Sequence, residues 1–400
     1  MKKTIAALLA LALLFSLAAC STPTESQQPN ATTAPTKPTE PLPEIYNRKS
    51  YTGTAEDMIA HRSDVVATFG DAKLTNGLLQ MYYWMDVYNF LNSYSSSLSQ
   101  YGLDINKPLD QQTCTGTAGT WQHYFLAGAL EGWAYYQALA LAADENNIPL
   151  TPDRQKIMDT LQDDLLKKAV DQGFATIDAM VQSDAGIGCT AEDYIRYTEI
   201  YHKALSYSDS IFRKIEVTDE MINNYFTEKE AHLAVNGINK DSGDSFLVRH
   251  ILIEVGKDKT DKDWDECRKQ AQELLDTWQA GEATEDSFAE LAKEHSADPG
   301  SKSDGGLYRG LSAQTNFVQE FKDWYLDSSR KPGDYGMIKT SYGYHLMYFS
   351  GTEPIWYYYC REMILNEKFD ETLASTIEKY KPDLRYEEML IGEVKLTEEK

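Results

Sequence analysis

The first half of the chain has the apolar spacing of helices. Between residues 75 and 240, apolar side chains recur every three to four positions. Threonines precede several of these segments, and one is followed by proline, as is common at helix starts. The predicted helices cover 77–91, 120–146, a segment from 151, 190–215 and a segment from 218. A hairpin with strands at 65–69 and 72–74 is predicted before them.

The helix predicted at 77–91 is apolar on nearly all sides. A helix without a clear polar face is buried or covers several other elements. Its large side chains, among them Met81, Trp84 and Phe90, fit either a hydrophobic core or a cradle for an apolar client segment. The pattern leaves both interpretations open.

The pattern changes at Phe246, where alternation replaces the helical spacing. The predicted order is a strand at 246–255, helices at 263–280 and 285–295, a Gly/Ser/Asp loop at 297–309, a helix at 316–326, and strands at 337–339 and 343–349. Helices beside a small antiparallel sheet make an α+β unit.

A final helix at 357–380 and a strand-like segment after it are too short to fold alone. We expect them to return to the helical block, which makes the α+β unit an insertion. The predicted domains are therefore a helical domain at 50–244, an α+β domain at 245–352 and a returning segment at 353–400.

Two strands of the α+β unit each place one histidine inside an apolar run. His250 lies in "VRHILIEV" and His345 lies in "GYHLMYF". If these strands are neighbours, alternation allows both imidazoles to point to one face. A neutral imidazole has one donor and one acceptor nitrogen, so a facing pair can satisfy itself in an apolar sheet. Such a pair is either structural or part of a site.

The N-terminal segment resembles an export signal. Lys2 and Lys3 precede an apolar stretch that ends in "LAAC", which predicts a signal peptide at 1–19 and a lipid attached to Cys20. An ordinary signal peptide that ends near a cysteine is the alternative. Residues 20–49 are rich in Pro and Thr and are predicted to form a disordered tether.

The charge and the cysteines narrow the class of protein. A net charge of −24 disfavours nucleic acid and anionic lipid as direct partners. It fits simple solubility or cationic client segments. Besides Cys20, four scattered cysteines show no metal-binding spacing and fit buried thiols or one disulfide: Cys114, Cys189, Cys267 and Cys360. No metal or other cofactor is predicted.

Residues 246–351 resemble the parvulin family of peptidyl-prolyl cis/trans isomerases. The landmarks are "VRHILI", "FAELAKEHS" leading into "SADPGSKSDGG", "FVQEF", and "PGDYGMIKTSYGYHLMYF". The resemblance implies catalytic roles for His250, Asp298 and His345, although Asp298 could instead cap a turn. It implies that the substrate proline is bound by residues at four positions: Leu307, Phe317, Phe321 and Tyr342. The segment 305–309 reads Gly-Gly-Leu-Tyr-Arg, where many parvulins read Gly-Gly-Asp-Leu-Gly.

The layout around this unit is similar to that of PrsA/SurA-type extracytoplasmic foldases. That resemblance implies a lipid-anchored isomerase and chaperone on the outer face of the cell membrane, acting without a cofactor. The implied partners are unfolded or partly folded exported polypeptides, with a homodimer as an option. A holdase whose parvulin domain binds without turnover is the alternative. A solute-binding lipoprotein would need two α/β lobes, which the helical block argues against.

Overall fold

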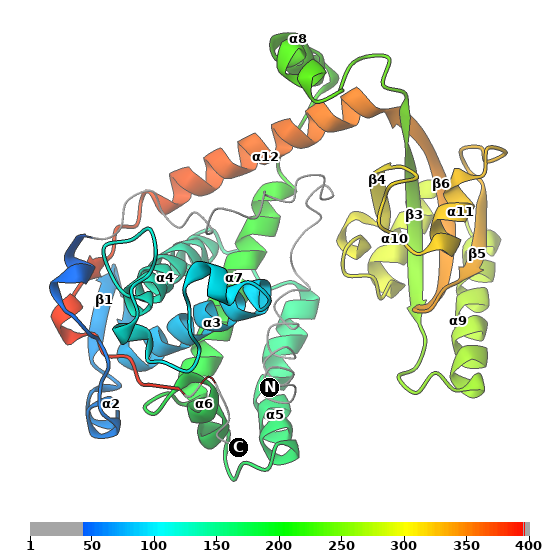
Figure 1. The fold of residues 1–400 in the computed structure, drawn as a ribbon. Helices are drawn as coiled ribbons and strands as arrows, with labels where there is room; N and C mark the ends of the chain where they lie inside the picture. The colour runs from blue at the N-terminus through cyan, green and yellow to red at the C-terminus, as the bar shows by residue number, and fades with distance from the viewer. Residues whose placement is uncertain (1–42, 395, 397–400) are drawn as a thin grey trace. The chain divides into compact units, whose positions relative to one another are not determined.

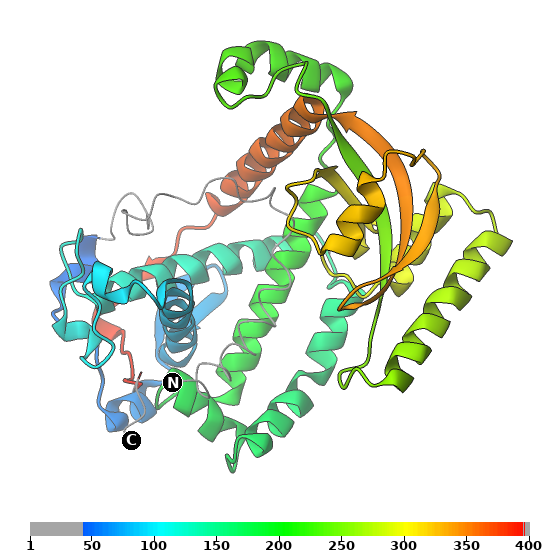
Figure 2. The ribbon, with the colours of Figure 1, turned by 45° about the vertical axis from the view of Figure 1, so that its right-hand side comes forward.

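The computed structural model describes residues 43–394 and 396. The signal peptide predicted at 1–19, the lipid site at Cys20 and the tether up to residue 42 lie outside the described residues. The described chain forms two compact units, one from residues up to 215 together with those from 369, and one from 216–368 (Figures 1 and 2). The fold class is α+β, as predicted.

The first unit is mainly helical. Its helices are α2 (Ala55–His61), α3 (Asn76–Tyr94), α4 (Trp121–Glu145), α5 (Pro152–Asp171), α6 (Ile177–Ala185) and α7 (Ala191–Phe212). The predicted caps are present, since the hydroxyls of Thr75, Thr151 and Thr190 accept main-chain N–H groups of the first helical turn. The helices predicted at 77–91, 120–146 and 190–215 therefore begin and end close to the predicted residues.

Helix α3 lies in the core of this unit. Met81, Trp84 and Phe90 are each less than a tenth exposed. The Phe90 ring contacts Trp121 and Phe125 of α4, at centroid distances of 5.2 and 5.6 Å. Of the two interpretations of this apolar helix, the structure supports the core.

The C-terminal segment returns to the first unit. Strand β7 (Asp383–Leu384) pairs with β1 (Val65–Phe69), which pairs with β2 (Ala72–Thr75), so the sheet order is β2-β1-β7. Past this strand, the indole N–H of Trp84 donates to the carbonyl of Gly392.

The end of the predicted tether is ordered. Residues Pro43–Asn47 form the 3-10 helix η1, and Ile45 is fully buried. The Arg48 guanidinium donates to the carbonyls of Tyr386, Glu387 and Met389. The prediction of disorder is wrong for 43–49. The Ile45 side chain is buried, and Arg48 forms hydrogen bonds with residues that are distant in the sequence.

The second unit is built on a four-stranded antiparallel sheet with the order β4-β3-β6-β5. The strands are β3 (Asp244–Glu254), β4 (Leu307–Leu311), β5 (Tyr335–Lys339) and β6 (Gly343–Pro354). Its helices are α8 (Asp219–Val235), α9 (Asp261–Ala280), α10 (Glu285–His295), α11 (Gln319–Leu326) and the first part of α12 (Ile355–Ile377). Strand β4 falls partly within the loop predicted at 297–309, because an edge strand of five residues leaves a weak pattern.

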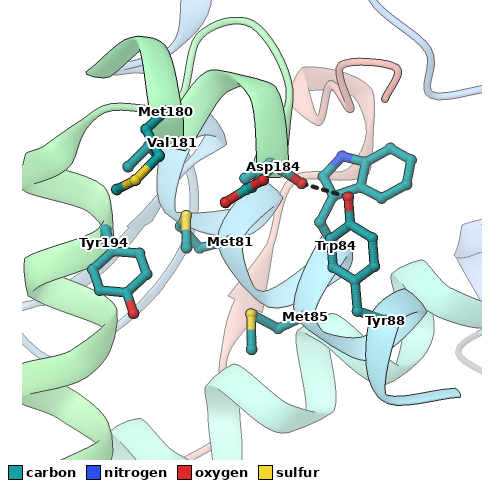
Figure 3. Close-up of a pocket in the computed structure, with 9 residues that line it drawn as sticks. Met81, Trp84, Met85, Tyr88, Met180, Val181, Asp184 and Tyr194 are labelled. Atoms are coloured by element: carbon teal, nitrogen blue, oxygen red, sulfur yellow. Dashed lines mark hydrogen bonds between the residues drawn. The ribbon is translucent and has the colours of Figure 1, made fainter. Parts of the chain in front are cut away.

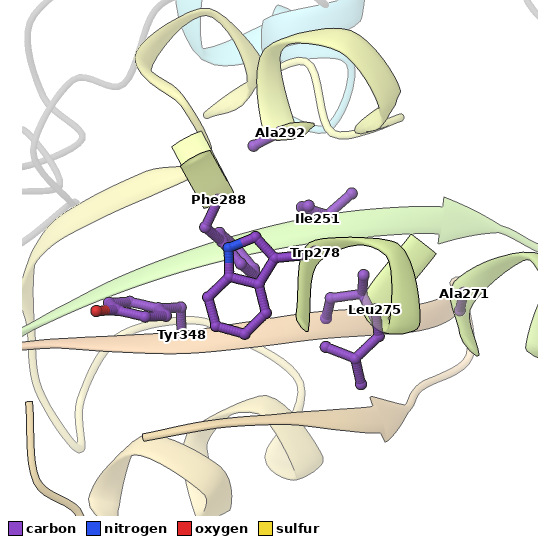
Figure 4. Packing of buried hydrophobic residues seen from close by; sticks show 8 residues of the cluster. Ile251, Ala271, Leu275, Trp278, Phe288, Ala292 and Tyr348 are labelled. Atoms are coloured by element: carbon purple, nitrogen blue, oxygen red, sulfur yellow. The ribbon is translucent and has the colours of Figure 1, made fainter. Parts of the chain in front are cut away.

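The two faces of this sheet have separate cores. On one face, Ile251 and Leu346 of the sheet pack against Trp278 of α9 and Phe288 of α10 (Figure 4). On the other face, Val248, Met347 and Phe349 pack against residues of α11. Alternation along β3 and β6 therefore leaves the even positions of β3 and the odd positions of β6 facing α11.

The second unit begins before the predicted boundary at residue 245. Ile222 and Phe226 of α8 form a buried cluster with Cys360 and Ile364 of α12. The helix α8 therefore belongs to the second unit, whereas the later part of α12 belongs to the first. Within the described residues, no helix has both the length and the apolarity required to cross a membrane.

A small cavity in the first unit is lined by apolar side chains of α3, α6 and α7, among them Met81, Trp84 and Met180 (Figure 3). Asp184 lies at this cavity, and its main-chain carbonyl accepts the hydroxyl of Tyr88. Burial raises the pKa of the Asp184 carboxyl to about 6, against the opposing attraction of Lys168. Between about pH 4 and 6 the folded state therefore holds a proton that the unfolded state releases.

We expect Asp184→Asn to stabilise the first unit by about 1 kcal/mol at pH 8, with a smaller effect below pH 5. The reason is that the wild-type carboxylate must ionise in an apolar site at high pH. Hydrogen exchange of α3 amides at both pH values measures this, with Asp171→Asn as an exposed control for the loss of one charge. Equal effects at both pH values would contradict the prediction.

Candidate active site

The two histidines lie on neighbouring strands and on one face of the sheet. His250 of β3 is opposite Met347 of β6, and His345 of β6 is opposite Leu252 of β3. The two Nδ1 atoms are 3.1 Å apart, and the rings stack at a centroid distance of 5.3 Å. The predicted geometry of two imidazoles meeting inside an apolar sheet is confirmed.

Both imidazoles are buried and use both nitrogens. His250 is 3% exposed and His345 is 5% exposed. The Nε2 of His250 is 2.8 Å from Oδ2 of Asp298, and the Nε2 of His345 is 2.8 Å from the hydroxyl of Thr340. A chain of hydrogen bonds thus runs from Thr340 through both rings to Asp298.

The Oδ2 atom of Asp298 ends this chain as an acceptor of three hydrogen bonds. Its Oδ2 accepts from His250 and from the hydroxyls of Ser301, at 2.5 Å, and Tyr308, at 3.0 Å. Its Oδ1 accepts the main-chain N–H of Gly300, in the manner of a turn. Asp298 therefore both caps its turn and contacts His250, so the two interpretations of this residue hold together.

The protonation of the cluster follows from burial and charge. Burial raises the pKa of Asp298, but the hydrogen bond and charge of His250, with the hydroxyls of Ser301 and Tyr308, bring this pKa well below its ordinary value. Burial and the neighbouring His250 lower the pKa of His345 to about 3. Asp298 is therefore ionised and His345 is neutral at pH 7.

One proton arrangement satisfies every contact when both rings are neutral. His250 donates its Nε2–H to the Asp298 carboxylate, so its Nδ1 is an acceptor. His345 then donates its Nδ1–H to that nitrogen, and its Nε2 accepts the hydroxyl of Thr340. The carboxylate thus determines the tautomers of both imidazoles.

Aromatic side chains cover the histidines. The ring of Phe321, on α11, meets His250 and His345 edge to face, at 5.1 and 5.6 Å. Phe317 lies 5.0 Å from Phe321 and 4.9 Å from Tyr308. Phe317 is partly exposed while Phe321 is buried, so these rings lead from the surface down to the imidazoles.

Two predicted substrate-binding residues do not reach this cluster. Leu307 is paired with Arg249, whose guanidinium bonds Glu285 on the other face of the sheet. Alternation places Tyr308, and not Leu307, on the face of the histidines. The side chain of Tyr342 is 58% exposed, and its main-chain N–H donates to Thr340. The structure thus places Leu307 and Tyr342 away from the imidazoles, and their roles in substrate binding stay predictions.

The sequence did not predict a place in this cluster for three of its residues: Ser301, Tyr308 and Thr340. Each is an ordinary polar residue in or beside a loop, without a distinctive spacing. The departure from the usual parvulin pattern at 305–309 was the available signal for Tyr308. Its contact with Asp298 depends on the register of β4 against β3, which local periodicity does not reveal.

The buried neutral His345 predicts acid sensitivity of the second unit. The pKa of His345 in the folded state lies below its unfolded value of about 6.5, so the unfolded state binds a proton more readily. The free energy of unfolding is therefore at its full value above about pH 6.5 and falls as the pH is lowered towards 3. Between pH 7.5 and 5 we expect a loss of about 2 kcal/mol from this group. Hydrogen exchange of β3 and β6 amides should show it, and His345→Gln should show a smaller loss. An identical pH dependence in the variant would refute the assignment.

The cluster has an apolar surface that can bind a ligand and buried polar groups that create a local electric field. Its hydroxyls are not arranged as activated nucleophiles. The Asp298 oxygen nearest His250 already accepts three donors, and the hydroxyls of Ser301 and Tyr308 point at that same oxygen. Within the described residues, no group of three or more His, Cys, Asp or Glu side chains is placed to hold a metal ion. What the arrangement provides is an apolar aromatic surface over a buried polar chain.

Comparison with known proteins identifies the class of this unit. The PPIC-type PPIASE domain family matches residues 232–351. The chain therefore contains a parvulin-type peptidyl-prolyl isomerase domain, and the site lies within it. The relatives are chaperones and foldases, and the chain resembles a PrsA/SurA-like foldase.

Two curated relatives show the extent of the similarity. The chain is 30% identical over 159 residues to the chaperone SurA of Pseudomonas fluorescens, covering 37% of this chain and 34% of that protein. It is 31% identical over 137 residues to the foldase protein PrsA of Halalkalibacterium halodurans, covering 33% and 32%. The matches thus span about a third of these relatives.

Two solved structures also overlap the chain. PrsA from Bacillus subtilis is 19% identical and covers 68% of this chain and 90% of its own, with a TM-score of 0.29. PrsA from Bacillus anthracis is 18% identical and covers 62% and 96%, with a TM-score of 0.21.

Proposed function

We propose that this protein is a membrane-anchored peptidyl-prolyl cis/trans isomerase and chaperone that assists the folding of exported proteins. The observation that carries the proposal is the buried chain of Thr340, His345, His250 and Asp298 beneath Phe317 and Phe321, inside a parvulin-type domain. In this proposal His250, Asp298 and His345 are the catalytic residues.

The proposed catalysis is non-covalent. Rotation about an X-Pro bond must break amide resonance, which sets a barrier of roughly 18–20 kcal/mol. An apolar site that binds the proline ring favours the twisted amide over the more polar planar one, and so acts on the transition state. Lowering the barrier by about 4 kcal/mol would accelerate rotation roughly a thousandfold.

In this proposal the aromatic and polar residues have separate tasks. Phe317 and Phe321 bind the pyrrolidine ring, since Phe321 contacts both imidazoles and Phe317 contacts Phe321 and is partly open to solvent. The buried His250, His345 and Asp298 set a fixed electrostatic field beneath that ring. Because these groups satisfy one another, they need not reorganise when the amide twists.

The anchoring is proposed from the N-terminal sequence. A lipid on Cys20 would hold the folded units at the extracytoplasmic face of the membrane, with residues after it as the connection. Incorporation of labelled palmitate by the wild-type chain, and its loss in Cys20→Ser, would support this. Equal labelling of both would contradict it.

A holdase without turnover is the second candidate. The observation that favours it is the net charge of −24, because an acidic protein attracts cationic client segments. A protease-coupled assay on proline tetrapeptides, run with the purified chain, separates the candidates. Catalysis supports the isomerase. A silent chain that still suppresses aggregation of a denatured cationic client supports the holdase, and failure in both assays overturns both.

A further inference from the structure

Tyr308 contacts both the aromatic rings of the site and the carboxylate of Asp298. Its ring stacks on His250 at 5.5 Å and meets the ring of Phe317 at 4.9 Å. Its hydroxyl donates to Oδ2 of Asp298 at 3.0 Å. Of the two hydroxyls that donate to that oxygen, the one on Tyr308 belongs to a ring that also contacts Phe317.

The strand that carries Tyr308 is held on both sides. In the preceding turn, the carbonyl of Gly306 accepts the main-chain N–H of His250. In the following residue, the Arg309 guanidinium pairs with the buried carboxylate of Glu353 on β6. Next along the strand, Gly310 has a φ of 66°, and a side chain there would overlap the ring of Tyr358. These contacts fix the register that directs Tyr308 towards Asp298.

The turn that carries Asp298 is shaped to admit the phenol. A Cβ atom placed on Gly300 would lie 2.7 Å from the Tyr308 hydroxyl oxygen, closer than non-bonded atoms allow. Glycine at this position therefore permits the phenol to reach the carboxylate. Burial and the neighbouring Asp298 charge both raise the pKa of the phenol, so it keeps its proton and acts as a donor.

We propose that Tyr308 is a positioning residue that couples the proline pocket to Asp298. Its hydroxyl stabilises the Asp298 carboxylate, and this carboxylate sets the tautomer of His250. Its ring forms the wall of the proposed pocket, a role that the resemblance to parvulins implied for Leu307. The inference rests on the proposed function for its catalytic consequence, whereas the effect on Asp298 and His250 is a property of the folded unit.

The test uses Tyr308→Phe, which removes the hydroxyl and keeps the ring. NMR of the carboxyl carbon should show the pKa of Asp298 shifted upwards, and imidazole ¹⁵N shifts should show a changed proton distribution on His250. We expect kcat/KM for proline peptides to fall about five- to tenfold, carried by kcat, with KM within about twofold. Gly300→Ala, which displaces the hydroxyl without altering Tyr308, should reproduce both spectroscopic changes.

The control is Tyr325→Phe, which removes a buried phenol that donates to the carbonyl of Ser312, away from Asp298. It should leave the Asp298 titration and the His250 shifts unchanged. Unchanged spectra in Tyr308→Phe, or equal changes in the control, would overturn the inference. If the wild-type chain shows no turnover, the proposed function fails, and the two spectroscopic measurements still decide the role of Tyr308.

Discussion

Phe321→Ala is expected to lower kcat/KM for a proline tetrapeptide by about ten- to a hundredfold, since the lost apolar contact is worth about 1.5–3 kcal/mol. The ring of Phe321 is the one aromatic group on α11 that contacts both imidazoles in the described structure. Without it, the proline ring loses its packing partner and water gains access to the histidines. Both effects favour the planar amide.

The same change also weakens the fold. Phe321 is 3% exposed, and removing such a ring costs about 3–5 kcal/mol. Phe288→Ala is the matched control, because Phe288 is fully buried on the opposite face of the same sheet (Figure 4). Activity is compared at a temperature where both variants are folded by circular dichroism. If Phe288→Ala loses as much kcat/KM as Phe321→Ala, the binding role of Phe321 is wrong.

Asp298→Ala is expected to abolish most of the isomerase activity and to destabilise the second unit. Three donors, on His250, Ser301 and Tyr308, would lose their common acceptor. A buried polar group left without a partner costs about 1–3 kcal/mol. The free energy of unfolding should therefore fall by several kcal/mol, and the two imidazoles should lose their defined tautomers.

Asp298→Asn separates charge from shape. The wild-type carboxyl has a pKa below its ordinary value, so its stabilisation is complete above about pH 4 and is lost as the pH falls further. The amide cannot titrate, so its unfolding free energy should not show this acid loss. Asp323→Asn, at an exposed position of α11, controls for the charge. Wild-type activity in Asp298→Asn would show that the negative charge is not needed.

The sequence predicted the local elements well because their signals are local. Capping threonines and three- to four-residue apolar spacing locate α3, α4 and α7 within a few residues. The alternation in β3 and β6 put His250 and His345 on a common face, and their contact requires only that these strands be neighbours. A tertiary contact could be predicted here because a buried imidazole in an apolar strand needs a polar partner.

The remainder of the site depended on contacts between segments whose own patterns are weak. The short edge strand β4 takes its register from β3, and a shift of one residue decides whether Leu307 or Tyr308 faces the histidines. Ser301 and Thr340 reach their partners through turns, where side-chain direction is not periodic.

Helix caps, strand alternation and the order of the elements could thus be predicted from the sequence alone, since each depends on residues a few positions apart. The ordering of 43–49, the assignment of α8 to the second unit and the placing of the hydroxyls of Ser301 and Tyr308 at Asp298 were decided by folding. These features arise when segments distant in the sequence bury a shared surface, and no short stretch of residues encodes its partner.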